Sequence, residues 1–521
     1  MPKKRKIWIV VLSLLVLLAA GVFGLFRARS SMQTEITLIS ARSADGVIRM
    51  EWSAEQAQSW SALTLRVTDV KDGSREELSV EPEAGFAEFS GGKPDRLYYL
   101  EGEAQKKDGG KETVLRTVRL FLRYDSLPNL PLLVIDTDSG NDPSYDVAEK
   151  PDRTLWGETQ INNHYETGSI SLGNAASERV KIKTRGNTST VTGDKKSYKL
   201  KFSSAVNLLS TQDCAQKEWA LLNNGYDLRS YMGAYIGERL CVGWGLPGRF
   251  VNVLLNGDWK GCYLLTPTVS RSTAGESVSA SGYIFENDPY WWKEGTVSFR
   301  LQRQDAHMAY TFKYPEVTAA TDSRMAALSR YWQDFEDALY RADGSYRDYI
   351  DVDSFAAWLL ARDVLANGDE AGSNMYFYKY DMRSGEENAS KVKMGPLWDF
   401  DHAFETEGAW SNVHDGEVFV FPQLLRDEVF CEAYRKQWER ISPSLLQDVT
   451  ACLARLEQEQ GEAIDHSWKL DWLRWAGPVN WEEMPEERFS GKKEEMLRFF
   501  AERIAWMDAM TVQANTPLGR G

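Results

Sequence analysis

The sequence predicts an α+β chain in which a transmembrane helix and a small β-sandwich precede a larger mixed domain. Three observations carry this prediction: an apolar run near the N-terminus, period-two alternation over residues 33–125, and a later change from alternating strands to helical periodicity. With 521 residues the chain has length for two or three domains, and a hydrophobic content of 43% is ordinary for packed globular material.

The N-terminus predicts a single-pass membrane anchor. Residues 1–6 carry four basic side chains, and residues 7–26 are apolar except for Ser13. Twenty such residues can cross a bilayer, and the basic cluster favours a cytoplasmic N-terminus with the bulk of the chain extracytoplasmic. A cleaved signal peptide is the alternative, but the run exceeds the usual apolar length and no convincing cleavage site precedes Arg27.

Residues 33–125 have the rhythm of short antiparallel strands. Ile48, Met50 and Trp52 alternate with Arg49 and Glu51, and glycine-containing turns separate such segments. This pattern predicts a β-sandwich of fibronectin-III or immunoglobulin type. A spacer is the favoured role, with ligand binding left open. Two prolines in the linker that follows place the boundary before a main domain at 130–515.

Two strands of the main domain present lysines on one face. The segments 180–185 and 197–202 alternate, with apolar residues opposite the lysines. A phosphoryl-transfer site needs a lysine on a strand beside the phosphates, and we expect Lys199, or failing that Lys196, in this role. The alternative is a solvated edge strand, where lysine is also common.

The loop between these strands could hold phosphate groups. Its backbone N–H groups and the side chains of Arg185, Asn187 and Ser189 are suited to this, although a polar hairpin loop would have a similar sequence. No Walker A or Gly-x-Gly-x-x-Gly motif is present. A helix is predicted over residues 227–240, where Glu238 could pair with the strand lysine; exposed helical glutamates are also commonplace.

Three polar residues have the spacing of a phosphoryl-transfer centre. Asp369 and Asn374 form an Asp-x₄-Asn pair, and Asp399 follows a predicted strand. In such a centre one aspartate positions and deprotonates the acceptor hydroxyl, while an asparagine and a second aspartate bind the metal. Capping and turn roles are the alternative for all three. Asp401 could assist the metal or cap a turn.

Several segments in order resemble the CotH kinase family over roughly residues 130–405. They are Leu130–Ile135, Arg185–Ser189, Lys195–Phe202, Trp219–Leu222 with Asp227, Asn256–Tyr263, Lys313–Glu316, Asp369–Asn374 and Trp398–Asp401. The resemblance implies an atypical protein-kinase-like catalytic domain that uses ATP, Mg²⁺ or Mn²⁺, and a protein acceptor in the cell envelope or spore coat. The chain departs from the family at Thr266, near which a glutamate is usual.

Composition narrows the remaining possibilities. A net charge of −15 argues against nucleic acid as a partner, and five widely spaced cysteines form neither a disulfide framework nor a zinc site. Five tryptophans in the helical C-terminal part are expected to be core residues, with carbohydrate stacking as the alternative. The competing functions are a non-catalytic envelope scaffold binding protein or polysaccharide, and a hydrolase using Asp399 and Asp401.

Overall fold

The computed structural model describes most of the chain in segments. The described residues are 37–42, 47–52, 57–69, 73–93, 96–121, 130–150, 159–173, 175–186, 188–209, 214–224, 227–293, 297–305, 307–367, 374–382, 390–404, 420–475 and 489–513. The predicted membrane anchor at 7–26 lies outside them, as do Asn187 and Asp369. Within the described segments, no helix combines the length and apolar character needed to cross a membrane.

The chain divides into two compact units. The first comprises residues 1–127 with 257–259 and 472–484, and the second comprises 128–256, 260–471 and 485–521.

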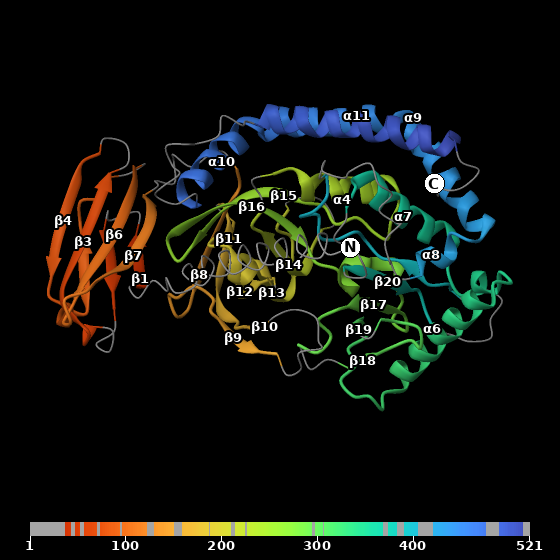
Figure 1. Ribbon diagram of the computed structural model, residues 1–521, viewed down its shortest axis with the longest axis horizontal. Helices are drawn as coiled ribbons and strands as arrows, with labels where there is room; N and C mark the ends of the chain where they lie inside the picture. The colour runs from red at the N-terminus through yellow and green to blue at the C-terminus, as the bar shows by residue number, and fades with distance from the viewer. Residues whose placement is uncertain are drawn as a thin grey trace, which may run out of the picture. The chain divides into compact units, whose positions relative to one another are not determined.

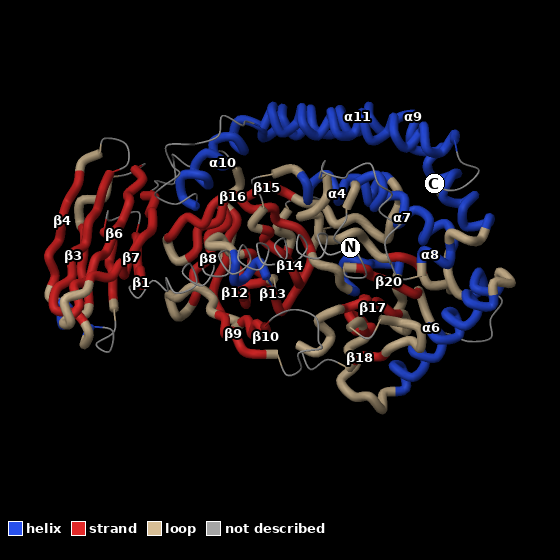
Figure 2. The backbone as a smooth tube through the Cα atoms, in the orientation of Figure 1, coloured by secondary structure: helices blue, strands red, loops and turns tan. Residues whose placement is uncertain are grey.

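The first unit contains two antiparallel sheets around one apolar core (Figure 2). Met50 and Trp52 are buried, as the alternation predicts, and pack in one cluster with Leu65 and Leu100 of the other sheet. The sheet orders are β1-β2-β5 and β4-β3-β6-β7. The strands are β1 (Thr37–Arg42), β2 (Val47–Glu51), β3 (Trp60–Asp69), β4 (Arg75–Val80), β5 (Phe86–Phe89), β6 (Arg96–Lys106) and β7 (Lys111–Phe121).

The second unit begins with a closed seven-stranded barrel in the order β11-β12-β13-β14-β16-β15-β8 (Figure 1). Ile182, Leu200 and Leu221 are fully buried in its core, which explains the period-two alternation. A two-stranded sheet, β9 with β10, is separate from the barrel. The strands are β8 (Leu132–Thr137), β9 (Tyr145–Glu149), β10 (Thr159–Asn163), β11 (Glu166–Leu172), β12 (Glu178–Arg185), β13 (Ser197–Val206), β14 (Gln216–Leu222), β15 (Arg249–Leu255) and β16 (Asp258–Pro267).

A five-stranded sheet, β18-β19-β17-β20-β21, follows the barrel in sequence. Strands β17 and β20 alternate: Phe285 and Phe377 lie opposite each other on the face that packs in the main core, while Glu286 and Tyr376 lie opposite each other on the other face. The strands are β17 (Tyr283–Asp288), β18 (Ser298–Phe299), β19 (Ala309–Tyr314), β20 (Met375–Lys379) and β21 (Lys393–Met394).

Helices complete the second unit. Asp322, Asp351 and Asp427 each accept a backbone N–H bond at a helix N-cap, which fixes where α6, α7 and α9 begin. Helix α9 packs on both α7 and α11. The helices are α3 (Thr188–Thr192), α4 (Arg229–Arg239), α5 (Arg271–Ala274), α6 (Ser323–Arg341), α7 (Val352–Leu365), α8 (Phe421–Leu424), α9 (Glu428–Leu456), α10 (Glu462–Trp475) and α11 (Phe489–Gln513). The predicted α+β class is confirmed.

Candidate active site

Asn374 and Asp399 come together although 25 residues separate them. Asn374 immediately precedes β20, and its amide Nδ2 donates to Asp399 Oδ2 at 3.2 Å. The buried Asn367, just after α7, donates to the Asp399 backbone carbonyl at 3.0 Å. Both Asn374 and Asp399 have left-handed backbone conformations, with φ of 55° and 66°. Apart from glycine, asparagine and aspartate are the residues that adopt this conformation most readily.

Arg185 places a positive charge beside this pair. It ends β12, and its guanidinium carbon lies 5.4 Å from the centroid of the Trp398 ring. Burial lowers the Arg185 pKa, while Asp399, Tyr376 and Asp401 act in the opposite direction. Arginine nevertheless remains protonated, because its intrinsic pKa lies far above neutral pH. The sequence-predicted residues Arg185, Asn374 and Asp399 therefore share one region.

Asp401 has partners of its own near the start of α4. Its Oδ1 accepts from Asn224 Nδ2 at 2.9 Å, and its backbone carbonyl accepts from the Arg229 guanidinium. Asn224 also donates to Ser230 in α4 at 2.8 Å. These contacts fix the chain just after Asp399, so Asp401 acts here as a structural link.

The donor set around Asp399 fits a magnesium ion of the kind that is shared with phosphates. Mg²⁺ commonly takes one or two protein oxygen ligands, with water and phosphate oxygens completing its shell. The Asp399 carboxylate and the Asn374 amide oxygen meet that requirement. Among the described residues there is no cluster of three or more histidine, cysteine or acidic side chains suited to a metal. Asp399 and Asn374 are therefore residues that could hold such an ion.

The loop after Arg185 contains a short helix, α3, where the sequence suggested only a loop. Gly186 has φ +107°, and a Cβ there would lie 2.2 Å from Ser189 Oγ, so glycine is required. The Thr190 hydroxyl donates to the Gly186 carbonyl at 2.8 Å. The ammonium of Lys196 donates to the carbonyls of Thr190 and Gly193. Lys196 therefore holds this turn together.

Lys199 and Glu238 are not brought together. Lys199 alternates with the inward-facing Leu200 and forms an ion pair with Glu218 at 2.9 Å, on the outer face of the barrel. Glu238 is exposed on α4, and within the described segments no ion pair joins it to Lys196 or Lys199.

Thr266, the position near which the family usually has a glutamate, is buried in β16. Its hydroxyl donates to the Leu246 carbonyl at 3.4 Å.

Glu286 and Lys313 form an ion pair that was not among the sequence-predicted site residues. Lys313 Nζ lies 2.6 Å from Glu286 Oε2. Burial opposes the charge on Lys313, but Glu286, Tyr376 and Asp288 outweigh it and raise the Lys313 pKa above its usual value. Burial and the Glu286 charge also raise the pKa of Asp288 to about 6. The one sequence signal was that Lys313 lies in a segment resembling the family.

Lys195 is a second charged residue without a predicted role. Its buried ammonium donates to Asp471 Oδ2 at 2.8 Å and to the Cys262 carbonyl at 2.6 Å. The same Asp471 oxygen accepts from the Cys262 backbone N–H at 2.9 Å. A Cβ at Gly261 would lie 2.0 Å from Asp471 Oδ1, so this position admits only glycine. Lys195 thus links the segment just before β13 to α10. The neighbouring lysines have other partners: Lys196 holds the turn around α3, and Lys199 pairs with Glu218.

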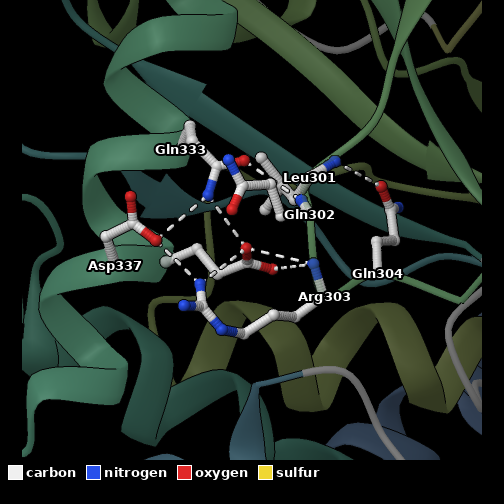
Figure 3. Close-up of polar contacts among 7 residues, drawn as sticks. Leu301, Gln302, Arg303, Gln304, Gln333 and Asp337 are labelled. Atoms are coloured by element: carbon white, nitrogen blue, oxygen red, sulfur yellow. Dashed lines mark hydrogen bonds and ion pairs between the residues drawn. The ribbon is translucent and has the colours of Figure 1, made fainter.

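A polar network supports β17 from the apolar side of the sheet (Figure 3). Glu336 on α6 is buried and accepts from the Arg303 backbone N–H and from its guanidinium, each at 3.2 Å. Gln302 N–H donates to Gln333 of the same helix at 3.0 Å. Gln304 then donates to the buried Asn287 at 2.7 Å, next to Glu286 in β17. The network fixes the strand that carries Glu286.

The sequence matches the family described as CotH kinase protein over residues 182–507. A search of curated proteins found no match. Among solved structures, the chain is similar at 10% identity and a TM-score of 0.23 to the twitchin kinase region from C. elegans (Fn31-NL-kin-CRD-Ig26). That alignment covers 70% of this chain and 50% of the twitchin chain.

Proposed function

Because this chain belongs to the CotH kinase protein family, whose match covers most of the second unit, we propose that it is an atypical kinase that transfers the γ-phosphate of ATP to a protein hydroxyl group. Support comes from the contact between Asn374 and Asp399 beside Arg185. These residues supply the oxygen ligands and the positive charge that such a transfer requires.

The proposed roles follow from the chemistry of each group. Asp399 and Asn374 would hold Mg²⁺ or Mn²⁺, which neutralises charge on the β- and γ-phosphates when bound. Arg185 offsets the remaining phosphate charge. Asp369, which lies outside the described residues, would position the acceptor hydroxyl and accept its proton. The acceptor oxygen forms a bond to the γ-phosphorus, the bond to the β,γ-bridging oxygen breaks, and ADP leaves.

Incorporation of γ-labelled phosphate by the purified full-length chain tests this function. With Mg²⁺ or Mn²⁺ and a generic protein acceptor, Asp399→Asn should remove the label, because the substitution removes a negatively charged metal ligand without changing its size. Asp353→Asn is the matched control: Asp353 is exposed in the first turn of α7, and its substitution should leave incorporation unchanged.

The competing function is a non-catalytic envelope scaffold that binds protein or polysaccharide. It is favoured by the engagement of Lys196 and Lys199 with other groups and by Thr266 at a position where glutamate is expected. A wild-type chain that neither incorporates label nor binds ATP in the presence of metal would support the scaffold and exclude the kinase.

We also propose that residues 7–26 anchor the chain and that both units lie outside the cytoplasm, in the cell envelope or spore coat. Support comes from the apolar run and the basic residues before it. Cys241 is exposed, so a membrane-impermeant maleimide should label it on intact cells. The variant Cys241→Ser provides the background, and labelling that requires cell lysis would refute the orientation.

The first unit is proposed to be a fibronectin-III or immunoglobulin-type spacer. Its three- and four-stranded sheets around one core support that assignment. A spacer predicts that reversing an exposed charge on β4, as in Glu76→Lys, leaves phosphate incorporation unchanged. A reduced rate would instead indicate that this unit contacts the acceptor.

A further inference from the structure

Lys313 occupies a β-bulge on the polar face of the five-stranded sheet. Tyr314 pairs with Ile284 and Phe312 pairs with Phe285, so Lys313 is the extra residue between them. In a bulge the two residues that oppose one partner can both point to the same side of the sheet. Bulges are common beside active sites because they re-aim a side chain. Lys313 lies on the same face of the sheet as Thr311 and Glu286, which are paired across the two strands.

Glu286 holds that ammonium from the adjacent strand. The separation of 2.6 Å is that of a charge-assisted hydrogen bond, and the Glu286 side chain is only 11% exposed. The Lys313 side chain keeps 34% exposure even though burial is the largest single influence on its charge. The Lys313 side chain is thus only partly covered by protein and remains in contact with solvent.

Tyr376 connects this ion pair to the candidate active site. It lies opposite Glu286 in the sheet and two residues after Asn374. Asn374 immediately precedes β20, the strand that pairs with β17, and it contacts Asp399. The Lys313–Glu286 pair and the proposed metal ligand Asn374 therefore lie on neighbouring strands of one sheet or next to them.

The lysines favoured by sequence have other partners. Lys196 donates to two carbonyls of the turn around α3, and Lys199 pairs with Glu218 on the outer face of the barrel. Lys195 is buried against Asp471. Protein kinases require a lysine on a strand, held by a glutamate, to bind the nucleotide phosphates. Of these lysines, Lys313 alone combines a glutamate partner, solvent access and a place beside Tyr376.

We propose that Lys313, positioned by Glu286, is the lysine that binds the nucleotide phosphates. This inference rests on the proposed kinase function and reassigns the role that the sequence suggested for Lys199 or Lys196. The pair comes from β19 and β17, which follow the barrel, so the phosphate-binding lysine would belong to the same sheet as the strand that begins after Asn374.

The test is nucleotide binding by the purified full-length chain, measured calorimetrically with Mg²⁺. Lys313→Met should weaken ATP binding by about 10-fold or more, the loss expected when a hydrogen bond between charged groups is removed. Binding of adenosine, which has no phosphate, should be unchanged in the same variant. A merely structural ion pair would not separate the two ligands. Lys313→Arg should retain part of the ATP affinity, and thermal unfolding checks that each variant is folded.

Lys199→Met is the matched control, since it removes an ammonium with an acidic partner elsewhere in the same unit. It should leave both affinities unchanged. Equal ATP affinity in wild type and Lys313→Met, or equal losses for ATP and adenosine, would overturn the inference while leaving the kinase function standing. A wild type that binds no ATP and transfers no phosphate would overturn both. ATP binding without transfer would contradict only the catalytic proposal, and the binding comparison would still decide the role of Lys313.

Discussion

The two faces of the five-stranded sheet differ in chemistry around Glu286 although the same strands form both. On one face Phe285, Tyr310 and Phe377 are fully buried and pack against Trp332 of α6. On the other face the neighbouring residues Glu286 and Tyr376 lie opposite each other, beside Lys313. A shift of one residue along any strand would exchange the two faces.

Within this sheet, one face provides stability and the other carries the polar groups. Burial of the aromatic face lowers the free energy of the folded protein, because apolar surface leaves water. This stabilisation fixes the register of the strands. Moving the charges of the polar face out of water costs free energy. These charges therefore require close partners, as Lys313 has in Glu286. The aromatic face thus holds the strands in the register that the polar face depends on.

The largest expected effect comes from the aromatic face. Phe377→Ala should lower the free energy of unfolding of the second unit by about 3–5 kcal/mol, because it leaves a cavity beside Phe285 and Trp332. Denaturant unfolding followed by tryptophan fluorescence measures the change. The matched variant on the opposite face, Tyr376→Phe, should cost about 1 kcal/mol or less, since it removes only a hydroxyl group. Equal costs for both would contradict the division between the faces.

An intermediate effect is expected from the network that supports the aromatic side. Glu336→Gln should lower the free energy of unfolding by about 1–3 kcal/mol, because the Arg303 guanidinium loses its buried charged partner. Chemical denaturation compares this variant with Asp337→Asn, which changes the exposed carboxylate beside it. The exposed substitution should cost well under 1 kcal/mol. A larger loss for Asp337→Asn would assign the support to the surface pair.

The smallest effect is a pH-dependent one on the polar face. The pKa of Asp288 is raised from 3.8 to about 6 by burial and by Glu286, against the opposing effects of Lys313 and of hydrogen bonds from Tyr290 and Thr311. A carboxyl group with a raised native pKa binds its proton more tightly when folded. Its stabilising contribution is therefore present below about pH 4 and is lost as the pH rises through about 6.

Asp288→Asn removes this titration. The variant should match the wild type in melting temperature near pH 4 and exceed it at pH 7, with the difference developing between these values. Melting curves collected across that pH range measure it. A difference that is the same at every pH would mean that Asp288 does not titrate in this interval.

Much of the fold follows from local sequence patterns. Period-two alternation predicts β12 and β13, and the buried Met50 of β2 and Trp52 just after it confirm the predicted inward face. The ordered segments that resemble the CotH kinase family predict that membership correctly. These signals succeed because strand alternation and motif order depend on the chain itself and only weakly on what packs against it.

The candidate site was only partly accessible from sequence. Asn374 and Asp399 were both predicted as metal ligands, and the structure places their side chains in contact. The choice among lysines could not be made, because alternation tells which face a side chain occupies but not what covers that face. Lys199 faces away from the barrel core toward Glu218, and nothing local distinguishes it from a phosphate ligand.

The α+β class, the alternation of individual strands such as β12 and β13, and the family could be predicted from sequence alone. Tertiary structure decided that Lys313 of β19 pairs with Glu286 of β17, that Tyr376 lies opposite Glu286, and that Arg185 from β12 lies near Asp399. The physical reason is that a site is made by side chains whose separation in sequence carries no information about distance. Their proximity arises only when the barrel and the five-stranded sheet have each closed around their own apolar core.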